Sequence, residues 1–300
     1  MPELRRQEVA CNLCDKSEST KLFTIRSFNV VKCPNCGLVY LNPMPCTEDI
    51  VKVYDAREYY CNKGSPADTP LGYPDYLMLK EHHNFVADEL LRPLKGINPG
   101  KVLDVGCGMG TMLKRFSELG WDTYGVDVST YATSYARNEL NLKIFTGVVE
   151  ELDLPENYFD LVTVIHVIEH IPNPKGALET LYRLMKPRGI LIIATHDICG
   201  LWPRVVKSKW RHLNIPEHTH FFSKNTLNRM LKRAGFCTVR ITETATLAAV
   251  TSDNNGLYTP ISLLYRYGLV RQAAPLLRAW HAAARILNIS DGVTIYSRKV

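Results

Sequence analysis

The chain has 300 residues, 46% of them hydrophobic, and carries 36 lysines and arginines against 30 aspartates and glutamates. This composition suits a globular core in one large or two modest domains, and the mild net charge of +6 does not favour a nucleic-acid partner. Because no stretch approaches the roughly 18 to 20 apolar residues of a membrane-spanning helix and the first residues contain no apolar leader segment, we expect a cytoplasmic protein.

Four cysteines mark the first predicted module. Two Cys-x2-Cys pairs stand 18 residues apart: Cys11, Cys14, Cys33 and Cys36. Each pair fits a tight knuckle, and two knuckles close the tetrahedron of a four-thiolate zinc ribbon over residues 1–45. A filled sulfur shell leaves no open position for a substrate, so we expect the Zn²⁺ to be structural. The other five cysteines follow no ligand spacing and are interpreted as packing residues: Cys46, Cys61, Cys107, Cys199 and Cys237.

Residues 46–95 are predicted to be a helical lead-in, because apolar positions recur at helical spacing over 48–60 and 76–94. Residues 96–300 then alternate between strand and helix patterns. Strands are predicted at 101–106, 123–128, 143–147, 161–167, 189–195, 237–244 and 292–299, and helices at 110–119, 130–140, 174–186 and 224–234. This alternation indicates an α/β fold, a Rossmann-like, mostly parallel seven-stranded sheet with helices on both faces.

A glycine-rich turn between the first strand and helix of this sheet predicts a cofactor site. The sequence Asp104-Val-Gly106-Cys107-Gly108-Met-Gly110 lets the backbone turn tightly, and Asp127, which ends the next strand, is positioned for ribose hydroxyls. A dinucleotide usually requires G-x-G-x-x-G without an adjacent carboxylate. The Asp104 carboxylate would repel phosphate but attract the ammonium or sulfonium of S-adenosylmethionine.

Several blocks together resemble the class I S-adenosylmethionine-dependent methyltransferases. They are the 104–110 turn, Gly125-Val-Asp127, the segment from Phe159 to Ile171 with Glu169-His170, and Leu184-Met-Lys-Pro-Arg-Gly189. The resemblance covers roughly residues 75 to 250. The ribbon, together with the 216–223 segment, is similar to a narrower branch that methylates deoxysugars, polysaccharide building blocks and natural products.

The resemblance implies roles for individual residues. Gly106 and the loop to Gly110 would contact the methionine end of the cofactor, and Asp127 would hold the ribose. Val128 would flank the adenine, with Val149 and Glu150 near its amino group. His166 would lie beside the sulfonium, unless it is an ordinary core histidine.

The long connection after the fifth strand is where we expect the acceptor chemistry. It runs from His196 to Phe222, and loops of this length in compact domains are usually functional. Removal of a proton near neutral pH favours histidine, and Glu217-His218 resembles an acid/base pair of sugar-modifying relatives. We therefore predict His218 as the base, with Glu217 beside it. Carbon-methylating relatives often have a tyrosine slightly earlier; Ile215 and Pro216 stand here, which favours an oxygen acceptor.

An insertion at about 254–290 is basic and amphipathic, and it contains no acidic residue from Asn254 to Ser290. Helices in this position cap the active site or form an oligomer contact, which is the favoured interpretation; a peripheral contact with an anionic membrane is the alternative.

Three functions remain open at this stage. The leading one is methyl transfer to a small-molecule acceptor, a hydroxyl or carbon of a sugar, glycan precursor or natural product. The second is an RNA methyltransferase with the ribbon as RNA-binding module, against which the scattered basic residues of the ribbon stand. The third is a non-catalytic module that binds S-adenosylmethionine. We also expect loss of zinc to unfold the ribbon without directly affecting methyl transfer.

Overall fold

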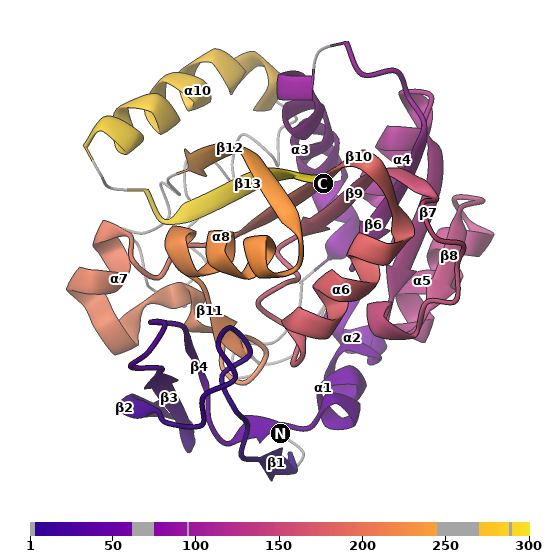
Figure 1. Ribbon diagram of the computed structural model, residues 1–300. Coiled ribbons are helices and arrows are strands. Elements are labelled where there is room, and N and C mark those ends of the chain that lie inside the picture. Colours follow the sequence, from indigo (N-terminus) through magenta and orange to yellow (C-terminus); the bar gives the residue numbers. More distant parts are fainter. Residues whose placement is uncertain (1–3, 62–74, 95, 245–269, 288–289) are drawn as a thin grey trace.

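The computed structural model describes residues 4–61, 75–94, 96–244, 270–287 and 290–300. A seven-stranded sheet forms its centre, in the order β12-β13-β10-β9-β6-β7-β8 (Figure 1). The strands are β6 (Lys101–Val105), β7 (Asp122–Asp127), β8 (Lys143–Thr146), β9 (Phe159–Ile165), β10 (Met185–His196), β12 (Phe236–Thr244) and β13 (Gly292–Lys299). Strand β13 runs antiparallel to β10 and to β12, while β10, β9, β6, β7 and β8 are parallel to one another. The predicted fold class is confirmed.

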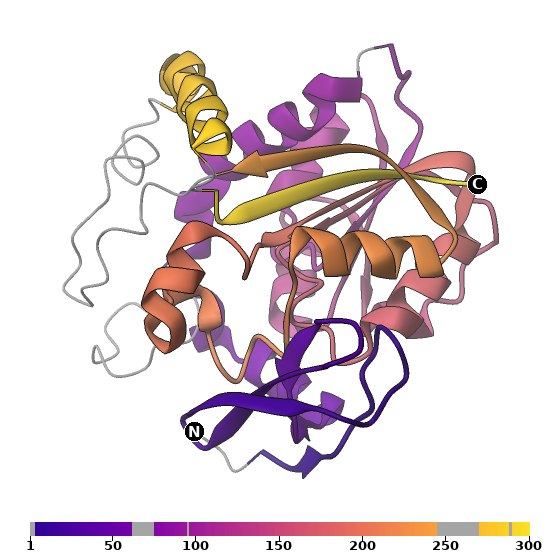
Figure 2. The same cartoon turned by 60° about the vertical axis from the view of Figure 1, so that its left-hand side comes forward.

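Helices cover both faces of this sheet. The main ones are α3 (Lys80–Leu91), α4 (Thr111–Glu118), α5 (Thr130–Asn138), α6 (Pro174–Leu184) and α8 (Lys224–Arg233). Apolar residues of α3 and α4 share one buried cluster with the sheet, and those of α6 and α8 share another. The two clusters hold the sheet between its helical layers, which Figure 2 shows in a second view. Because β6 to β10 are parallel to one another, their carboxyl ends lie along one edge of the sheet.

Two small sheets occupy the N-terminal region. Strand β1 (Arg6–Gln7) pairs with β5 (Met44–Pro45), and a four-stranded sheet has the order β11-β4-β3-β2. Its strands are β2 (Thr20–Ile25), β3 (Phe28–Lys32), β4 (Val39–Leu41) and β11 (His220–Phe221). Strand β11 belongs to the long connection after β10, so the N-terminal sheet is completed by a segment almost two hundred residues away in the sequence.

Short helices fill the lead-in and the long connection, and one more follows β8. They are α1 (Thr47–Tyr54), α2 (Arg57–Tyr60), η1 (Tyr76–Leu79), η2 (Arg92–Leu94), η3 (Val149–Glu151), α7 (Leu201–Val206), η4 (Lys207–Lys209) and η5 (Arg211–Leu213). The helical prediction for the lead-in therefore corresponds to several short helices and the longer α3.

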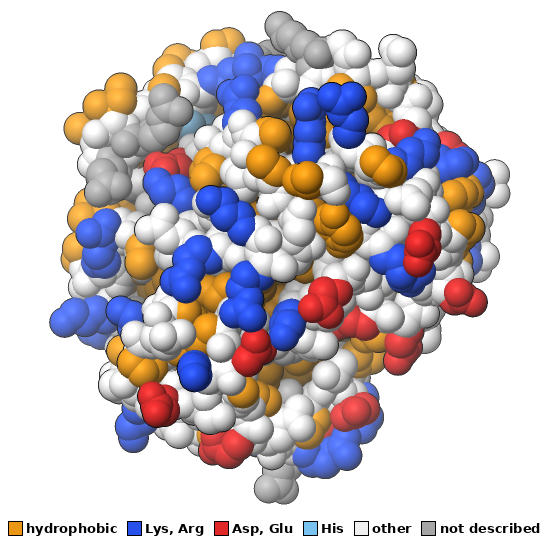
Figure 3. Space-filling model, viewed as in Figure 1, with side chains coloured by type: hydrophobic (Ala, Val, Ile, Leu, Met, Phe, Trp, Pro, Cys, Tyr) orange, Lys and Arg blue, Asp and Glu red, His pale blue; other side chains and the backbone are white. Residues whose placement is uncertain are grey.

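The predicted insertion is seen in part. Helix α10 (Val270–Ile286) packs against α3 and β12, and Arg278 on it forms an ion pair with Glu89 of α3. Residues 254–269, 288 and 289 lie outside the described residues. Figure 3 shows basic side chains spread over the face that contains α10, with acidic ones among them. Within the part of the chain that the structure describes, no helix is long and apolar enough to cross a membrane.

Candidate active site

The turn between β6 and α4 has a backbone that requires glycine. Gly106, Gly108 and Gly110 all have positive φ, at 68°, 52° and 77°, a region that other residues rarely adopt. A Cβ atom on Gly106 would also lie 2.3 Å from a methyl carbon of Val167. Cys107 is buried between the first two glycines. Gly106 is the exposed residue of the turn, so a ligand at the carboxyl edge of the sheet can approach its backbone closely.

Two buried carboxylates flank this turn. Asp104, 2% exposed, accepts a hydrogen bond of 2.7 Å from the hydroxyl of Thr163. Burial raises its pKa to about 7, although the Thr163 hydrogen bond opposes the shift. A buried carboxylate with one neutral donor is poorly compensated, and a cation beside it would favour its charged form. Asp104 therefore fits the cationic methionine end of S-adenosylmethionine.

Asp127 ties β7 to the glycine turn. Its Oδ2 accepts from the amide of Gly108 at 2.8 Å, and its Oδ1 accepts from the amide of Ser129 at 2.9 Å. Burial raises the pKa of this carboxyl, while the two amides oppose the rise. A carboxylate has about four lone-pair directions, so two amide donors leave capacity for ribose hydroxyls.

Tyrosines from the lead-in cover the turn, and no sequence signal identified them. The hydroxyl of Tyr60 lies 3.5 Å from Asp127 Oδ1. The hydroxyl of Tyr76 faces Gly108 so closely that a Cβ there would lie 2.6 Å from it. The two rings meet at an angle of 66° with centroids 5.5 Å apart. The helices α2 and η1 thus form an aromatic wall over the predicted cofactor site.

The residues predicted beside the adenine lie at the ends of β7 and β8. Val128 follows β7 and is half-buried, Val149 in η3 is buried, and Glu150 next to it is half-buried. Burial raises the pKa of the Glu150 carboxyl. All three therefore lie near the same edge as Asp127, and their contact with adenine stays a prediction.

Histidines gather around Glu169 beside the end of β9. The ring nitrogen Nδ1 of His166 lies 3.4 Å from Glu169 Oε1, and the rings of His166 and His196 are 4.7 Å apart. His166 follows β9 in a left-handed conformation with φ of 54°, and its side chain is 51% exposed. A left-handed backbone is strained at any residue other than glycine, and such strain is typical of functional sites. Glu169, by contrast, is 2% exposed.

His218 lies on the far side of the same carboxylate. It is 4% exposed, its Nδ1 lies 2.8 Å from the carbonyl of His212, and its ring centroid is 4.5 Å from that of His170. Burial, together with the nearby His170, lowers the pKa of His218 to about 3. The carboxylate that lies in one cluster with His218 is that of Glu169, and the predicted partner Glu217 is not part of this cluster. The carboxyl of Glu217 is buried, has its pKa raised to about 7 by that burial, and is hydrogen-bonded by Tyr59.

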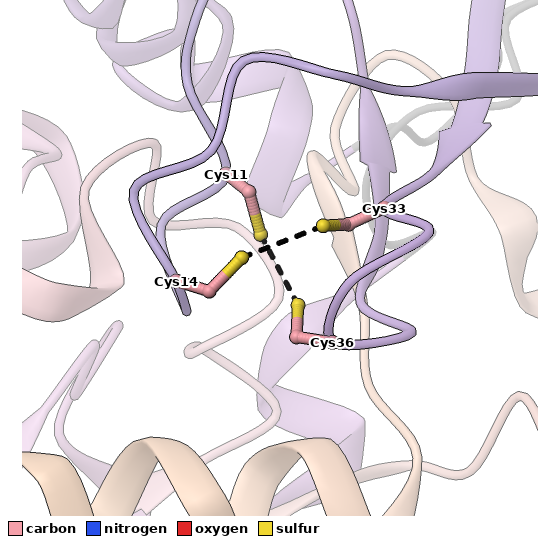
Figure 4. A group of neighbouring side chains, drawn as sticks. All are labelled: Cys11, Cys14, Cys33 and Cys36. Atoms are coloured by element: carbon pink, nitrogen blue, oxygen red, sulfur yellow. Dashed lines mark hydrogen bonds between the residues drawn. The ribbon is translucent and has the colours of Figure 1, made fainter.

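The four N-terminal cysteines converge as predicted (Figure 4). Their sulfur atoms lie within 4.8 Å of one another, and two pairs, Cys11 with Cys36 and Cys14 with Cys33, are 3.4 Å apart. A tetrahedral zinc with bonds of about 2.3 Å separates its sulfurs by about 3.8 Å, so the cluster fits this metal. Of the other cysteines, Cys107 is buried, Cys46 and Cys61 are half-buried, and Cys199 and Cys237 are exposed. The packing role predicted for the last two is wrong, because both face solvent.

Comparison with known proteins identifies the family. Residues 78–241, more than half of the chain, match the family described as "Methyltransferase domain". The chain belongs to this methyltransferase family. The predicted enzyme class is thereby confirmed.

Relatives of the methyltransferase include ubiquinone biosynthesis O-methyltransferases. That of Thiobacillus denitrificans is 31% identical over 179 residues, which are 55% of this chain and 72% of the relative. That of Alkalilimnicola ehrlichii is 35% identical over 114 residues, 36% of this chain and 46% of the relative. The match thus spans less than half of the Alkalilimnicola protein. The sugar-methylating branch is not among these relatives.

Solved structures support the fold of the methyltransferase. An S-adenosylmethionine-dependent methyltransferase from Archaeoglobus fulgidus superposes with a TM-score of 0.51 at 21% identity, over 75% of this chain and 99% of that one. The [4+2]-cyclase SpnF superposes with the same TM-score at 18% identity, over 72% of this chain and 81% of that one. A fold shared with a cyclase does not by itself define the reaction, so the site residues must carry that argument.

The N-terminal ribbon of the methyltransferase is joined to the histidine cluster by hydrogen bonds. The amide of Leu41 in β4 donates to the carbonyl of Thr219 at 2.9 Å, and the amide of Thr219 donates to the carbonyl of Glu169 at 2.9 Å. In addition, His220 of β11 pairs with Tyr40 of β4. A chain of hydrogen bonds thus runs from the ribbon to Glu169, and the prediction that loss of zinc does not directly affect methyl transfer stays a prediction.

Proposed function

We propose that this methyltransferase moves the methyl group of S-adenosylmethionine to a hydroxyl oxygen of a small-molecule acceptor, such as a sugar, a glycan precursor or a natural product. The observation that carries the proposal is the half-exposed His166, which follows β9 with a left-handed backbone and is paired with the buried Glu169. The relatives named as O-methyltransferases support an oxygen acceptor. On the face that Figure 3 shows, acidic side chains lie among the basic ones, which favours a small molecule over RNA.

The cofactor would be held at the carboxyl edge by residues that the sequence identifies. Asp104 would attract the cationic methionine end, and Asp127 would accept hydrogen bonds from the ribose hydroxyls. The glycines from Gly106 to Gly110 would let the cofactor approach the backbone of the turn. When bound, S-adenosylmethionine supplies a methyl group activated by the sulfonium. The protein then mainly has to align the acceptor with that group, since orientation provides much of the rate in such displacements.

His166 would remove the hydroxyl proton as the acceptor oxygen bonds to the methyl carbon and the carbon–sulfur bond breaks. Its Nδ1 lies beside Glu169 Oε1, which stabilises the imidazolium that forms and leaves Nε2 for the acceptor. The exposure of His166 favours it over His218, whose lowered pKa makes it a weak proton acceptor. His218 remains the alternative base.

A structural Zn²⁺ held by Cys11, Cys14, Cys33 and Cys36 completes the proposal. The support is the convergence of the four sulfur atoms from two knuckles, a donor set typical of closed zinc sites.

The test begins with a search for the acceptor. The purified chain is incubated with labelled S-adenosylmethionine and a panel of nucleotide sugars, phenols and RNA, and the transferred methyl group is counted. We expect a hydroxyl-bearing small molecule to be labelled. Labelling of RNA alone would support the RNA methyltransferase, and cofactor binding without any transfer would support the non-catalytic module.

The base is then tested by single substitutions. His166→Ala is expected to lower kcat by the roughly 10²- to 10⁴-fold that a positioned base contributes, with unchanged affinity for S-adenosylhomocysteine. The matched control is His220→Gln, because His220 is a buried histidine of β11 that lies outside the cluster around Glu169. If His218→Ala loses activity while His166→Ala keeps it, the base is His218.

A further inference from the structure

Glu169 is buried with one oxygen that lacks a partner. Its Oε1 faces His166, whereas Oε2 has no hydrogen-bond donor among the described residues. The side chain is only 3% exposed. Leaving a buried carboxylate oxygen without a donor is costly, so such an atom calls for an explanation. A cation bound to Oε2 provides one.

Two imidazoles, those of His170 and His218, lie near Glu169, and Nδ1 of each already has a hydrogen-bond partner. Nδ1 of His218 lies 2.8 Å from the carbonyl of His212, and Nδ1 of His170 lies 3.2 Å from the carbonyl of Glu217 and 2.6 Å from the hydroxyl of Tyr54. Since a carbonyl only accepts, Nδ1 of His218 carries the proton, and Nδ1 of His170 carries it in the tautomer that donates to the Glu217 carbonyl. In the neutral rings, Nε2 then keeps its lone pair. This arrangement is the one that metal-ligating histidines adopt.

The three side chains are also close enough to share an ion. One ligand atom from each of Glu169, His170 and His218 lies within 4.8 Å of the others. Their backbones are fixed relative to one another, because the amide of Thr219 donates to the carbonyl of Glu169 at 2.9 Å. The group is therefore held by the fold, with no metal needed to assemble it.

We propose that Glu169, His170 and His218 bind a divalent transition-metal ion, such as Zn²⁺, Mn²⁺ or Fe²⁺, beside the methyl-transfer site. Two imidazoles and a carboxylate suit these ions, whereas Mg²⁺ prefers oxygen ligands throughout. Three protein ligands leave at least one coordination position open to water or an acceptor oxygen. This site is distinct from the four-cysteine cluster of the ribbon.

A neighbouring group shares the same carboxylate but fits an ion less well. His166, Glu169 and His196 also lie within 4.8 Å of one another. However, His166 is half exposed, and Nδ1 of His196 has no hydrogen-bond partner within the described part of the chain. Neither ring is oriented by a backbone carbonyl in the way that His170 and His218 are, so we assign the ion to the latter pair.

The site is tested by titrating the metal-free full chain with Co²⁺ and recording its absorption spectrum. We expect two ions per chain: one with the intense thiolate-to-metal bands of a four-sulfur site, and one with the weaker bands of nitrogen and oxygen ligands. Glu169→Gln, which keeps the shape of the side chain, and His218→Gln should lose the second ion and retain the first. His220→Gln should bind both. The affinity lost should exceed the roughly 10- to 100-fold that removal of an outer partner costs.

The thiolate bands report in the same sample that the ribbon is folded. Binding of one Co²⁺ per chain by the wild type, or of a second ion equally well by Glu169→Gln, overturns the site. Should a variant lose the ribbon signal as well, wild-type chain with ¹⁵N-labelled histidine decides. In electron-nuclear resonance of bound Mn²⁺, coupling to imidazole nitrogen that persists in His166→Ala supports the site, and no coupling overturns it. Because these readouts do not depend on turnover, they are independent of the proposed reaction.

Discussion

The cofactor end and the acceptor end of this active site are built in different ways. The cofactor end draws its polar groups from a short stretch of sequence, the 104–110 turn and Asp127, which adjacent parallel strands β6 and β7 bring together. The acceptor end collects Tyr54, the 166–170 loop, His196 and the 212–218 segment. Strand β11, which follows that last segment, pairs with β4 of the ribbon. The residues of a site made by one strand–turn–helix unit have a fixed spacing along the sequence. The residues of a site made by four distant segments have no such spacing.

The largest effect on cofactor affinity is expected from a substitution at the cofactor end. In Asp127→Ala the ribose hydroxyls lose a charged acceptor, and the amides of Gly108 and Ser129 lose theirs. Hydrogen bonds to charged groups contribute about 1.5 to 3 kcal/mol each, so affinity for S-adenosylhomocysteine should fall by roughly 10²- to 10³-fold, as measured by calorimetry.

Asp127→Asn is the matched control, because it keeps the size of the side chain but removes its charge. It should bind more tightly than Asp127→Ala. Near-normal binding by the alanine variant would show that Asp127 only shapes the turn and does not contact the cofactor.

A substitution in the ribbon tests whether the acceptor end depends on β4. Cys33→Ser should lose the ribbon zinc and release β4 from β11, which displaces Thr219 and with it Glu169. A displacement of about 1 Å can lower a rate by roughly 10²-fold. We therefore expect kcat to fall by up to that factor while the affinity for S-adenosylhomocysteine stays the same. Metal analysis, calorimetry and turnover measure the three quantities.

Equal activity in Cys33→Ser would show that loss of the ribbon metal does not directly affect methyl transfer, as predicted from the sequence. Loss of cofactor affinity together with activity would instead show that the two ends of the site are not separable.

The smallest effect is a pH dependence of cofactor binding. Burial raises the pKa of Asp104 to about 7, above its ordinary value near 4, so the folded chain holds this proton between about pH 4 and 7. The stability from that proton is full below pH 4 and is lost as the pH rises through 7. A cationic ligand needs the ionised carboxylate, so affinity should fall by up to about tenfold per pH unit below pH 7. Calorimetry from pH 5.5 to 8 measures this slope, and Asp104→Asn should abolish it.

The sequence was informative wherever a local pattern carries the structure. The central strands follow from apolar periodicity, and the glycine turn follows from residues that alone tolerate its backbone. The four-cysteine cluster follows from knuckle spacing. The partners of the histidines did not follow: Glu169 rather than Glu217 joins His218, and Tyr60 and Tyr76 cover the turn, because these contacts depend on how distant segments pack. The exposure of Cys199 and Cys237 was missed for the same reason.

Strand β13 sets an order of events during biosynthesis. It lies between β10 and β12, and the register places Gly292 opposite both His196 and Thr244. A nascent chain that has released β6 to β10 already contains the glycine turn and Asp127, but β12 has no sheet neighbour until β13 leaves the ribosome. Pairing across so long an intervening segment is slow. In a stalled or newly released chain, the glycine turn and Asp127 should therefore come together before His196, at the end of β10, pairs with β13.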